Sequence, residues 1–127
     1  MDVSMVITTY NYATYLEECI ESCLSQINTS LEFEVIIVDD GSTDQTAEIM
    51  DGLTNSKLRK FRIENMGIEK ASNYGFNKAR GKYIVRVDAD DKLYSNYLSV
   101  LQPYLQDNME FYYPDYSVID SNGNVTE

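Results

Sequence analysis

The chain has 127 residues, 43% of them hydrophobic and 24% charged, which is the composition of one ordinary globular domain. Its net charge of −11 argues against nucleic-acid backbones and anionic membrane surfaces as partners of the whole domain. No apolar run approaches the ~20 residues of a bilayer span, and no window resembles a signal peptide. The predicted compartment is therefore the cytoplasm, with membrane association through other regions or partners left open.

Strand and helix patterns alternate along the chain. Short apolar runs predict strands at 3–8, 34–39, 58–63 and 82–87, the third near an edge of the sheet because it carries basic residues. Helices are predicted at 13–27, after 41–45, at 67–79 and at 94–106, and a last extended segment at 110–119. This order predicts an α/β fold: one domain over 1–127 with a doubly wound, mostly parallel sheet and helices on both faces.

Local signals add detail to three of these elements. Ser42 and Gln45 match a capping box at the start of the second helix. Cys19 and Cys23 share one apolar helical stripe, and the chain has no histidine and no third cysteine, so small core residues are favoured over a zinc site. All ten basic residues lie between Lys57 and Lys92. The basic residues at 57–60 are expected either to face a diphosphate or to form a solvated face.

Polar motifs follow three of the predicted strands. They are Thr8–Asn11, Asp39–Ser42 and Asp88–Asp91. Because parallel strands end at the same edge of a sheet, these motifs are expected to meet there, where such folds bind ligands.

The acids of these motifs suit a metal and a nucleotide. Asp88 and Asp90 repel each other unless a divalent cation offsets their charge, and Mg²⁺ or Mn²⁺ prefers such carboxylates together with phosphate oxygens. Asp91 suits the cap of the next helix equally well. Asp39 and Asp40 can accept from the N–H of a base or compensate a helix dipole. Tyr10 offers a ring for stacking, although eleven tyrosines make a structural role common here.

With these residues, the sequence resembles the family 2 glycosyltransferases, which have the GT-A fold. The resemblance covers nearly the whole chain and rests on the order and spacing of its motifs. They are Val6–Asn11, Ser22–Gln26, Glu34–Asp44, Asn65–Gly67, Asn73–Gly75, Ala79–Ile84 and Val87–Asp91.

The resemblance implies an inverting transferase that uses a nucleotide-diphosphate sugar, commonly a UDP-sugar, Mn²⁺ or Mg²⁺, and a carbohydrate or lipid-linked acceptor. It implies that Asp40 binds the nucleobase with help from Thr8 and Tyr10. By the same resemblance, Asp88 contacts the nucleotide, and Asp90 with Asp88 holds the metal.

Two departures from the family pattern matter. Ser72 stands where family members often carry an arginine, which leaves Lys70 or a later residue as the candidate for a phosphate contact. The family's general base lies in an acceptor half that would follow Glu127, so the chain is expected to be truncated before that half. The catalytic base is therefore unknown, and Asp115 and Asp120 match it by residue type alone.

Two other functions fit parts of the pattern. A domain that binds a nucleotide-sugar without transferring it would carry the same strand-end motifs. A phosphoacceptor receiver domain has a similar length and alternation, but it needs a lysine after a late strand. No Lys or Arg follows Lys92, which argues against that class.

Overall fold

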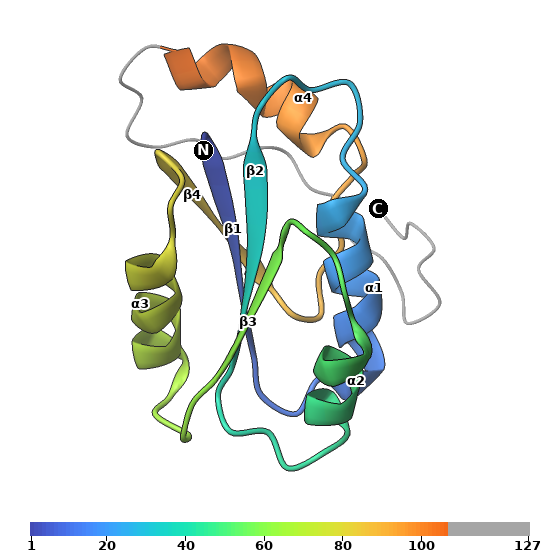
Figure 1. Cartoon of the computed structure of the whole chain (residues 1–127), viewed down its shortest axis with the longest axis vertical. Coiled ribbons are helices and arrows are strands. Elements are labelled where there is room, and N and C mark those ends of the chain that lie inside the picture. The colour runs from blue at the N-terminus through green and yellow to red at the C-terminus, as the bar shows by residue number, and fades with distance from the viewer. Residues whose placement is uncertain (107–127) are drawn as a thin grey trace, which may run out of the picture.

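A computed structural model describes residues 1–106 of the chain, and in this part it forms one parallel sheet (Figure 1). The strands are β1 (Val3–Thr9), β2 (Phe33–Asp39), β3 (Leu58–Arg62) and β4 (Tyr83–Asp88), in the order β3-β2-β1-β4. The predicted α/β class is confirmed. Within residues 1–106, no helix is both long and apolar enough to cross a membrane.

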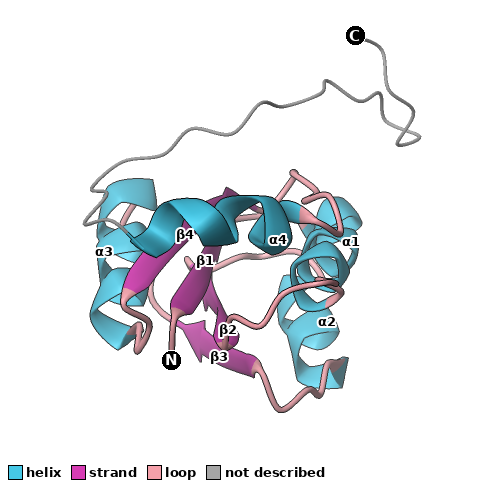
Figure 2. Ribbon diagram, turned by 90° about the horizontal axis from the view of Figure 1, so that it is seen from above, coloured by secondary structure: helices cyan, strands magenta, loops and turns pink. Residues whose placement is uncertain are grey.

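Helices cover both faces of this sheet (Figure 2). Helices α1 (Ala13–Leu24), α2 (Thr46–Gly52) and α4 (Tyr97–Leu101) pack on one face, where α4 continues into a 3₁₀ turn, η1 (Gln102–Gln106). Among the described residues, helix α3 (Ile68–Lys78) is the one helix on the other face. The two apolar clusters are therefore unequal, and the smaller one lies under α3.

The inner strands explain why both faces need cover. All seven residues of β1 and all seven of β2 are buried, as continuous apolar strands of parallel sheets are. The outer strands alternate instead. In β4, Val87 is buried with the larger cluster, whereas Ile84, Arg86 and Asp88 are exposed on the face that α3 covers only in part.

Several predicted boundaries differ from the structure. Helix α1 ends at Leu24, so Ile27, expected on its buried stripe, is 51% exposed, and its amide donates to the carbonyl of Ser95. Helix α3 ends at Lys78, before Gly81. The predicted helix 94–106 is a short α-helix followed by a 3₁₀ turn. The extended segment predicted at 110–119 lies outside the described residues.

Both predicted helix caps were wrong. Helix α2 begins at Thr46, and the Ser42 hydroxyl accepts from the Asn11 amide instead of capping that helix. Helix α4 begins at Tyr97, and Asn96 occupies the capping position. Asp91 lies five residues before Asn96, so it cannot cap this helix. The capping pattern at Ser42 misled because a hydrogen bond between two separate loops uses its hydroxyl.

The basic segment at the start of β3 binds protein groups. Lys60 donates to the carbonyls of Met50 and Leu53 at the end of α2, at 2.9 and 2.8 Å. Lys57 lies 4.3 Å from the centre of the Phe33 ring. These contacts tie β3 to its neighbours, while Lys57 and Lys60 stay exposed, as on a solvated face.

A buried carboxylate joins α3, β1 and β3 on the α3 face. Glu34 accepts from the Ser4 hydroxyl at 2.6 Å, from the Arg59 guanidinium at 2.9 Å and from the Arg80 amide at 2.7 Å. Burial acts to raise the pKa of Glu34, but these donors outweigh it and lower the pKa below its ordinary value. The network holds the connection between α3 and β4 in place.

We expect Glu34→Gln to lower the free energy of unfolding at neutral pH by about 3 kcal/mol, because it removes the buried charge that three donors, among them the part-buried Arg59 guanidinium, compensate. Urea unfolding followed by circular dichroism measures this loss. Glu48→Gln, on the exposed side of α2, is the matched control and should change little.

The same pair of variants has a predicted pH dependence. The pKa of Glu34 is lower in the folded than in the unfolded protein. Its contribution to the free energy of unfolding is therefore complete above the unfolded pKa of about 4.3, and it is lost as pH falls through the folded pKa. The gap in stability between wild type and Glu34→Gln should therefore narrow below about pH 4. A gap independent of pH would contradict this account.

Candidate donor-binding site

The three predicted strand-end motifs meet at one edge of the sheet. Thr8 pairs in register with Asp88 of β4, and Thr9 pairs with Asp39 of β2. Strand order reverses between β1 and β4, which flank this point, since the chain passes from β1 outward to β3 and then returns to β4. Crevices at such reversals are the usual ligand sites of parallel α/β sheets.

Asp39 is structural in this arrangement. Its carboxylate is fully buried, and Oδ1 accepts from the Ser42 amide at 2.9 Å. Its Oδ2 lies 3.5 Å from Nε of Arg62, which also donates to the Ser42 carbonyl at 3.1 Å. The ion pair is long, and Arg62 is 57% exposed, so the buried oxygen is only partly compensated. Asp39 therefore fixes the turn that follows β2.

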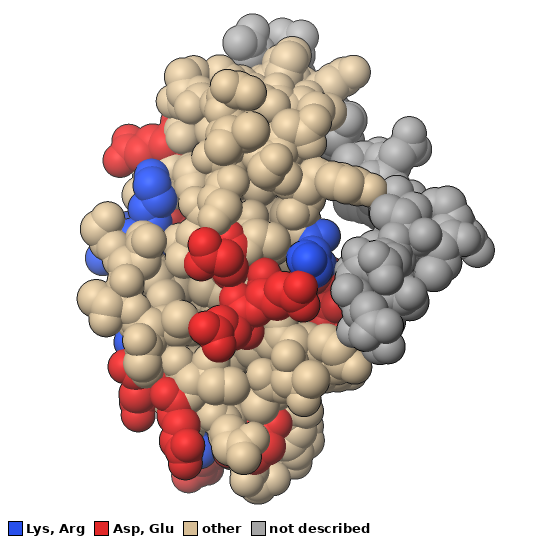
Figure 3. Space-filling model, turned by 90° about the vertical axis from the view of Figure 1, so that its right-hand side faces the viewer, with Lys and Arg blue, Asp and Glu red and all other residues tan. Residues whose placement is uncertain are grey.

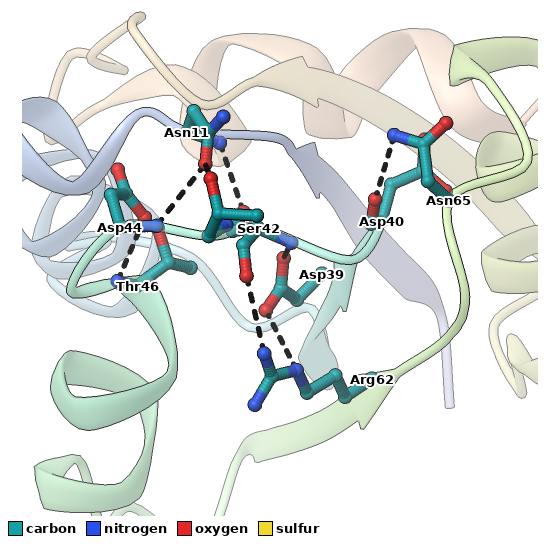
Figure 4. Close-up of polar contacts among 9 residues, drawn as sticks. Asn11, Asp39, Asp40, Ser42, Asp44, Thr46, Arg62 and Asn65 are labelled. Carbon is teal, nitrogen blue, oxygen red and sulfur yellow. Dashed lines mark hydrogen bonds and ion pairs between the residues drawn. The ribbon is translucent and has the colours of Figure 1, made fainter.

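Asn11 locks the same turn to β1 (Figure 4). Its backbone is left-handed, with φ 57°, a conformation that asparagine tolerates. Its side-chain oxygen accepts from the amides of Thr43 and Asp44, at 2.8 and 3.3 Å, while its own amide donates to the Ser42 hydroxyl at 2.9 Å. Two loops that carry site residues are thus held together before any ligand binds.

Asp40 faces the opposite side from Asp39 and orders the entrance to α3. It is buried, and its two carboxylate oxygens accept from the amides of Met66 and Gly67, at 2.7 and 3.0 Å. The Asn65 side chain donates to the Asp40 carbonyl at 3.2 Å. Each carboxylate oxygen retains a second lone pair, so Asp40 can still accept from a ligand.

The acid motif after β4 is open to solvent. Asp88 is 56% exposed and lies 3.5 Å from Nη2 of Arg86, and Asp90 is also exposed. Partial burial, then the charges of Asp90 and Asp88, raise the pKa of Asp91. Beneath the motif, the Cys19 thiol donates to the Asp88 carbonyl at 3.4 Å, and the free, buried Cys19 and Cys23 are core residues as predicted.

The exposed acids fit a hard divalent cation that the substrate helps to bind. Among residues 1–106, no group of three His, Cys, Asp or Glu residues is arranged to hold a metal by itself. Asp88 and Asp90 supply hard carboxylate oxygens, and Mg²⁺ commonly uses one or two carboxylates with phosphate oxygens completing its shell. The donor set therefore suits a metal that arrives with a diphosphate.

A groove along α1 lies apart from these residues. Its face of the molecule carries a concentration of acidic side chains (Figure 3). The groove contains none of the predicted site residues; its lining is Thr14, Glu17, Glu18, Glu21, Ser22, Ser25 and Lys92. Lys92 donates to Glu18 at 2.9 Å, an exposed pair that contributes little stability.

The structure therefore collects Thr8, Tyr10, Asp40 and Asp88 at one edge, with Asp90 just beyond it. Tyr10 is 43% exposed, so its ring is accessible. Asn11 and Arg62 are the contributors to this edge that the sequence did not reveal as such. For Asn11, an asparagine directly after a strand end was a usable signal, since this residue favours left-handed turns.

Gly41 allows the turn after β2 to approach the entrance of α3. Its φ is +77°, and a Cβ there would lie 2.8 Å from the Asn65 amide nitrogen.

We expect Gly41→Ala to lower the free energy of unfolding by roughly 1–3 kcal/mol, because both backbone strain and a backbone clash result. Gly52→Ala is the control. A Cβ at Gly52 would meet no atom within 4 Å, so this substitution should leave the free energy of unfolding unchanged or raise it. Equal urea midpoints for the two variants would refute this reading of Gly41.

Comparisons with solved structures agree with this geometry. Staphylococcus aureus TarS, residues 1–349 in complex with UDP, matches 84% of this chain and 32% of its own at TM-score 0.76 and 32% identity. The mannosyltransferase PcManGT from Pyrobaculum calidifontis, in complex with GDP-Man and Mn²⁺, matches 84% of this chain and 32% of its own at TM-score 0.68 and 29% identity. The fold is therefore the GT-A arrangement of these structures.

Sequence relatives point the same way. Glycosyltransferase GlyG of Streptococcus pneumoniae is 39% identical over 108 residues, which are 83% of this chain and 35% of GlyG. Chondroitin synthase of Pasteurella multocida is 42% identical over 93 residues, 72% of this chain and 9% of the synthase. The chain thus spans about a third or less of these relatives. The family model "Glycosyl transferase family 2" matches residues 4–126, and the chain belongs to that family.

Proposed function

We propose that this chain binds a nucleotide-diphosphate sugar, of UDP type, as the donor half of an inverting glycosyltransferase. The observation that carries the proposal is the row formed by the register partners Thr8 of β1 and Asp88 of β4 and by Asp40, which directly follows the end of β2. The row lies at the point where strand order reverses. A nucleoside presents N–H and O–H donors to such a row. The UDP complex of the similar TarS structure supports the choice of base.

Each site residue has a distinct proposed role. Asp40 accepts from the ring N–H of the base, and Thr8 lies beside it on the same sheet face. Tyr10 supplies an exposed ring against the base. Asp88 accepts from the ribose. The roles follow from position: the base lies at the buried end of the row, and the sugar-phosphate at its exposed end.

The exposed end is where a cation is needed. Asp88 and Asp90 would repel a diphosphate unless a divalent ion lay between them, so Asp90, with Asp88, is the proposed ligand of Mn²⁺ or Mg²⁺. When bound, that ion offsets the charge that develops on the departing diphosphate. The Mn²⁺ in the similar PcManGT structure supports this assignment.

Transfer itself requires groups beyond those described. Inversion needs a base that deprotonates the acceptor hydroxyl of a carbohydrate or a lipid-linked sugar. The chain covers 35% of GlyG and 32% of the TarS structure, so we propose that 1–127 is one donor-binding domain and that the acceptor half lies outside it. The second candidate is therefore a domain that binds the donor without transferring the sugar.

Titration calorimetry with UDP and Mn²⁺ tests the donor site. We expect Asp90→Ala to weaken binding at least about tenfold, since even outer partners of a bound metal matter that much. Asp51→Ala, an exposed acid on α2, is the control and should bind as the wild type does. Absence of UDP binding in the wild type, or binding that Asp90→Ala leaves intact, would refute the donor site.

Activity assays separate the two candidates. The chain and the product of its full natural reading frame are compared for hydrolysis of UDP-sugars and for transfer to acceptors. Binding by both with turnover only in the longer protein supports a donor half. Binding by both without any turnover supports the binding-only alternative.

A further inference from the structure

Two buried hydroxyls on the α3 face of the sheet, near the proposed base site, have no hydrogen-bond partner among the residues that the structure describes. They are Oγ of Ser72 on α3, 5% exposed, and Oγ1 of Thr8 on β1, 6% exposed. Oγ1 of Thr9, on the opposite face of β1, is a third such hydroxyl. Burying a hydroxyl without a partner is unfavourable, and an alanine would fill the Ser72 position without that cost. A ligand atom that accepts a hydrogen bond would account for both hydroxyls on the α3 face.

The packing of α3 places Ser72 at the level of Thr8. Gly75 lies against β1 so closely that a Cβ there would be 2.5 Å from Cγ1 of Val6. Helix α3 starts at the ligand edge of the sheet, because its entrance is bound to Asp40. Ser72 lies three residues before Gly75, which is about 4.5 Å along the helix toward the ligand edge. Thr8 lies two residues after Val6, which is about 6.6 Å along the strand toward the same edge. Ser72 and Thr8 therefore lie at similar distances from that edge.

The orientation of α3 turns Ser72 toward β4. Tyr74 and Lys78 lie on the β3 flank, since their side chains approach the Phe61 ring at 5.8 and 5.5 Å. At 3.6 residues per turn, Ser72 lies on the opposite flank of α3. That flank faces β4, where Asp88 is the register partner of Thr8. Ser72 therefore lies over the middle of the row formed by Asp40, Thr8 and Asp88.

The row has a hydrogen-bonding order that matches uridine. It presents an acceptor at Asp40, hydroxyl donors at Thr8 and Ser72, and an acceptor at Asp88. From the base toward the ribose, uridine presents the N3–H donor, the O2 carbonyl acceptor and the 2′-hydroxyl donor. The two sequences are complementary, and the hydroxyls fall opposite O2.

We propose that Ser72 is a nucleotide-binding residue whose hydroxyl, together with that of Thr8, donates to the O2 carbonyl of the uracil base. The inference rests on the proposed donor-binding function and deepens it.

The test replaces the acceptor atom and the donor residue in turn. Binding of UDP, 2-thio-UDP and 4-thio-UDP is measured with Mn²⁺ on wild type and Ser72→Ala, because sulfur is a weaker acceptor than oxygen. We expect Ser72→Ala to bind UDP about 3–10-fold more weakly, the worth of a neutral hydrogen bond. Wild type should prefer UDP over 2-thio-UDP by a larger factor than the variant does. The preference for UDP over 4-thio-UDP should be the same in both proteins.

Stability gives an independent readout. Ser72→Ala should unfold at the same urea midpoint as wild type or higher, since it removes an unpaired buried hydroxyl. Ser99→Ala, which removes a hydroxyl that donates to the Asn96 carbonyl on α4, is the control for nucleotide binding and should leave all three affinities unchanged.

The outcomes separate this inference from the proposed function. No UDP binding by wild type would refute the proposed function itself. UDP binding by wild type that Ser72→Ala leaves unchanged would overturn the role of Ser72 alone. A loss in Ser72→Ala with an unchanged preference for UDP over 2-thio-UDP would also overturn it, because Ser72 would then act through packing and not through O2.

Discussion

The site depends on two adjacent carboxylates at the end of β2 that face opposite sides of the sheet. Asp39 binds the turn amide of Ser42, and Asp40 binds the amides of Met66 and Gly67. Neighbouring like charges in a buried setting are costly unless N–H donors compensate them. Because a strand directs successive side chains to opposite faces, each acid recruits a different loop, and the two loops are ordered by one dipeptide.

This arrangement divides the site into a fixed part and an open part. Asp40 and Thr8 are buried, and backbone amides hold the Asp40 carboxylate, so little ordering remains when a base binds. Asp88 and Asp90 are exposed, and within residues 1–106 the one ion pair of this motif is the long contact of Asp88 with Arg86. Under the proposed roles, selectivity for the base belongs to the rigid part, whereas the metal and diphosphate would meet side chains that can still adjust.

The sequence predicted the parts of this structure that follow from hydrophobic pattern. All four strands and the meeting of Thr8, Asp40 and Asp88 at one edge could be expected, since apolar runs and parallel order determine them. The distinct roles of Asp39 and Asp40 could not, because which face each acid occupies depends on the exact end of β2. The burial of Ser72 could not be predicted for a similar reason, because it depends on the rotation of α3 over the sheet.

Asp88 connects the two parts of the site. It is the register partner of Thr8, it carries the exposed carboxylate at the end of the row, and its carbonyl accepts from the Cys19 thiol in the core and from the Asp91 amide in the acid motif. Under the proposed roles, any shift of the 88–91 loop on metal binding would move the ribose acceptor, Asp88, relative to the fixed base site. Metal and nucleoside binding would then be coupled through one residue, and each would change the affinity for the other by the same factor.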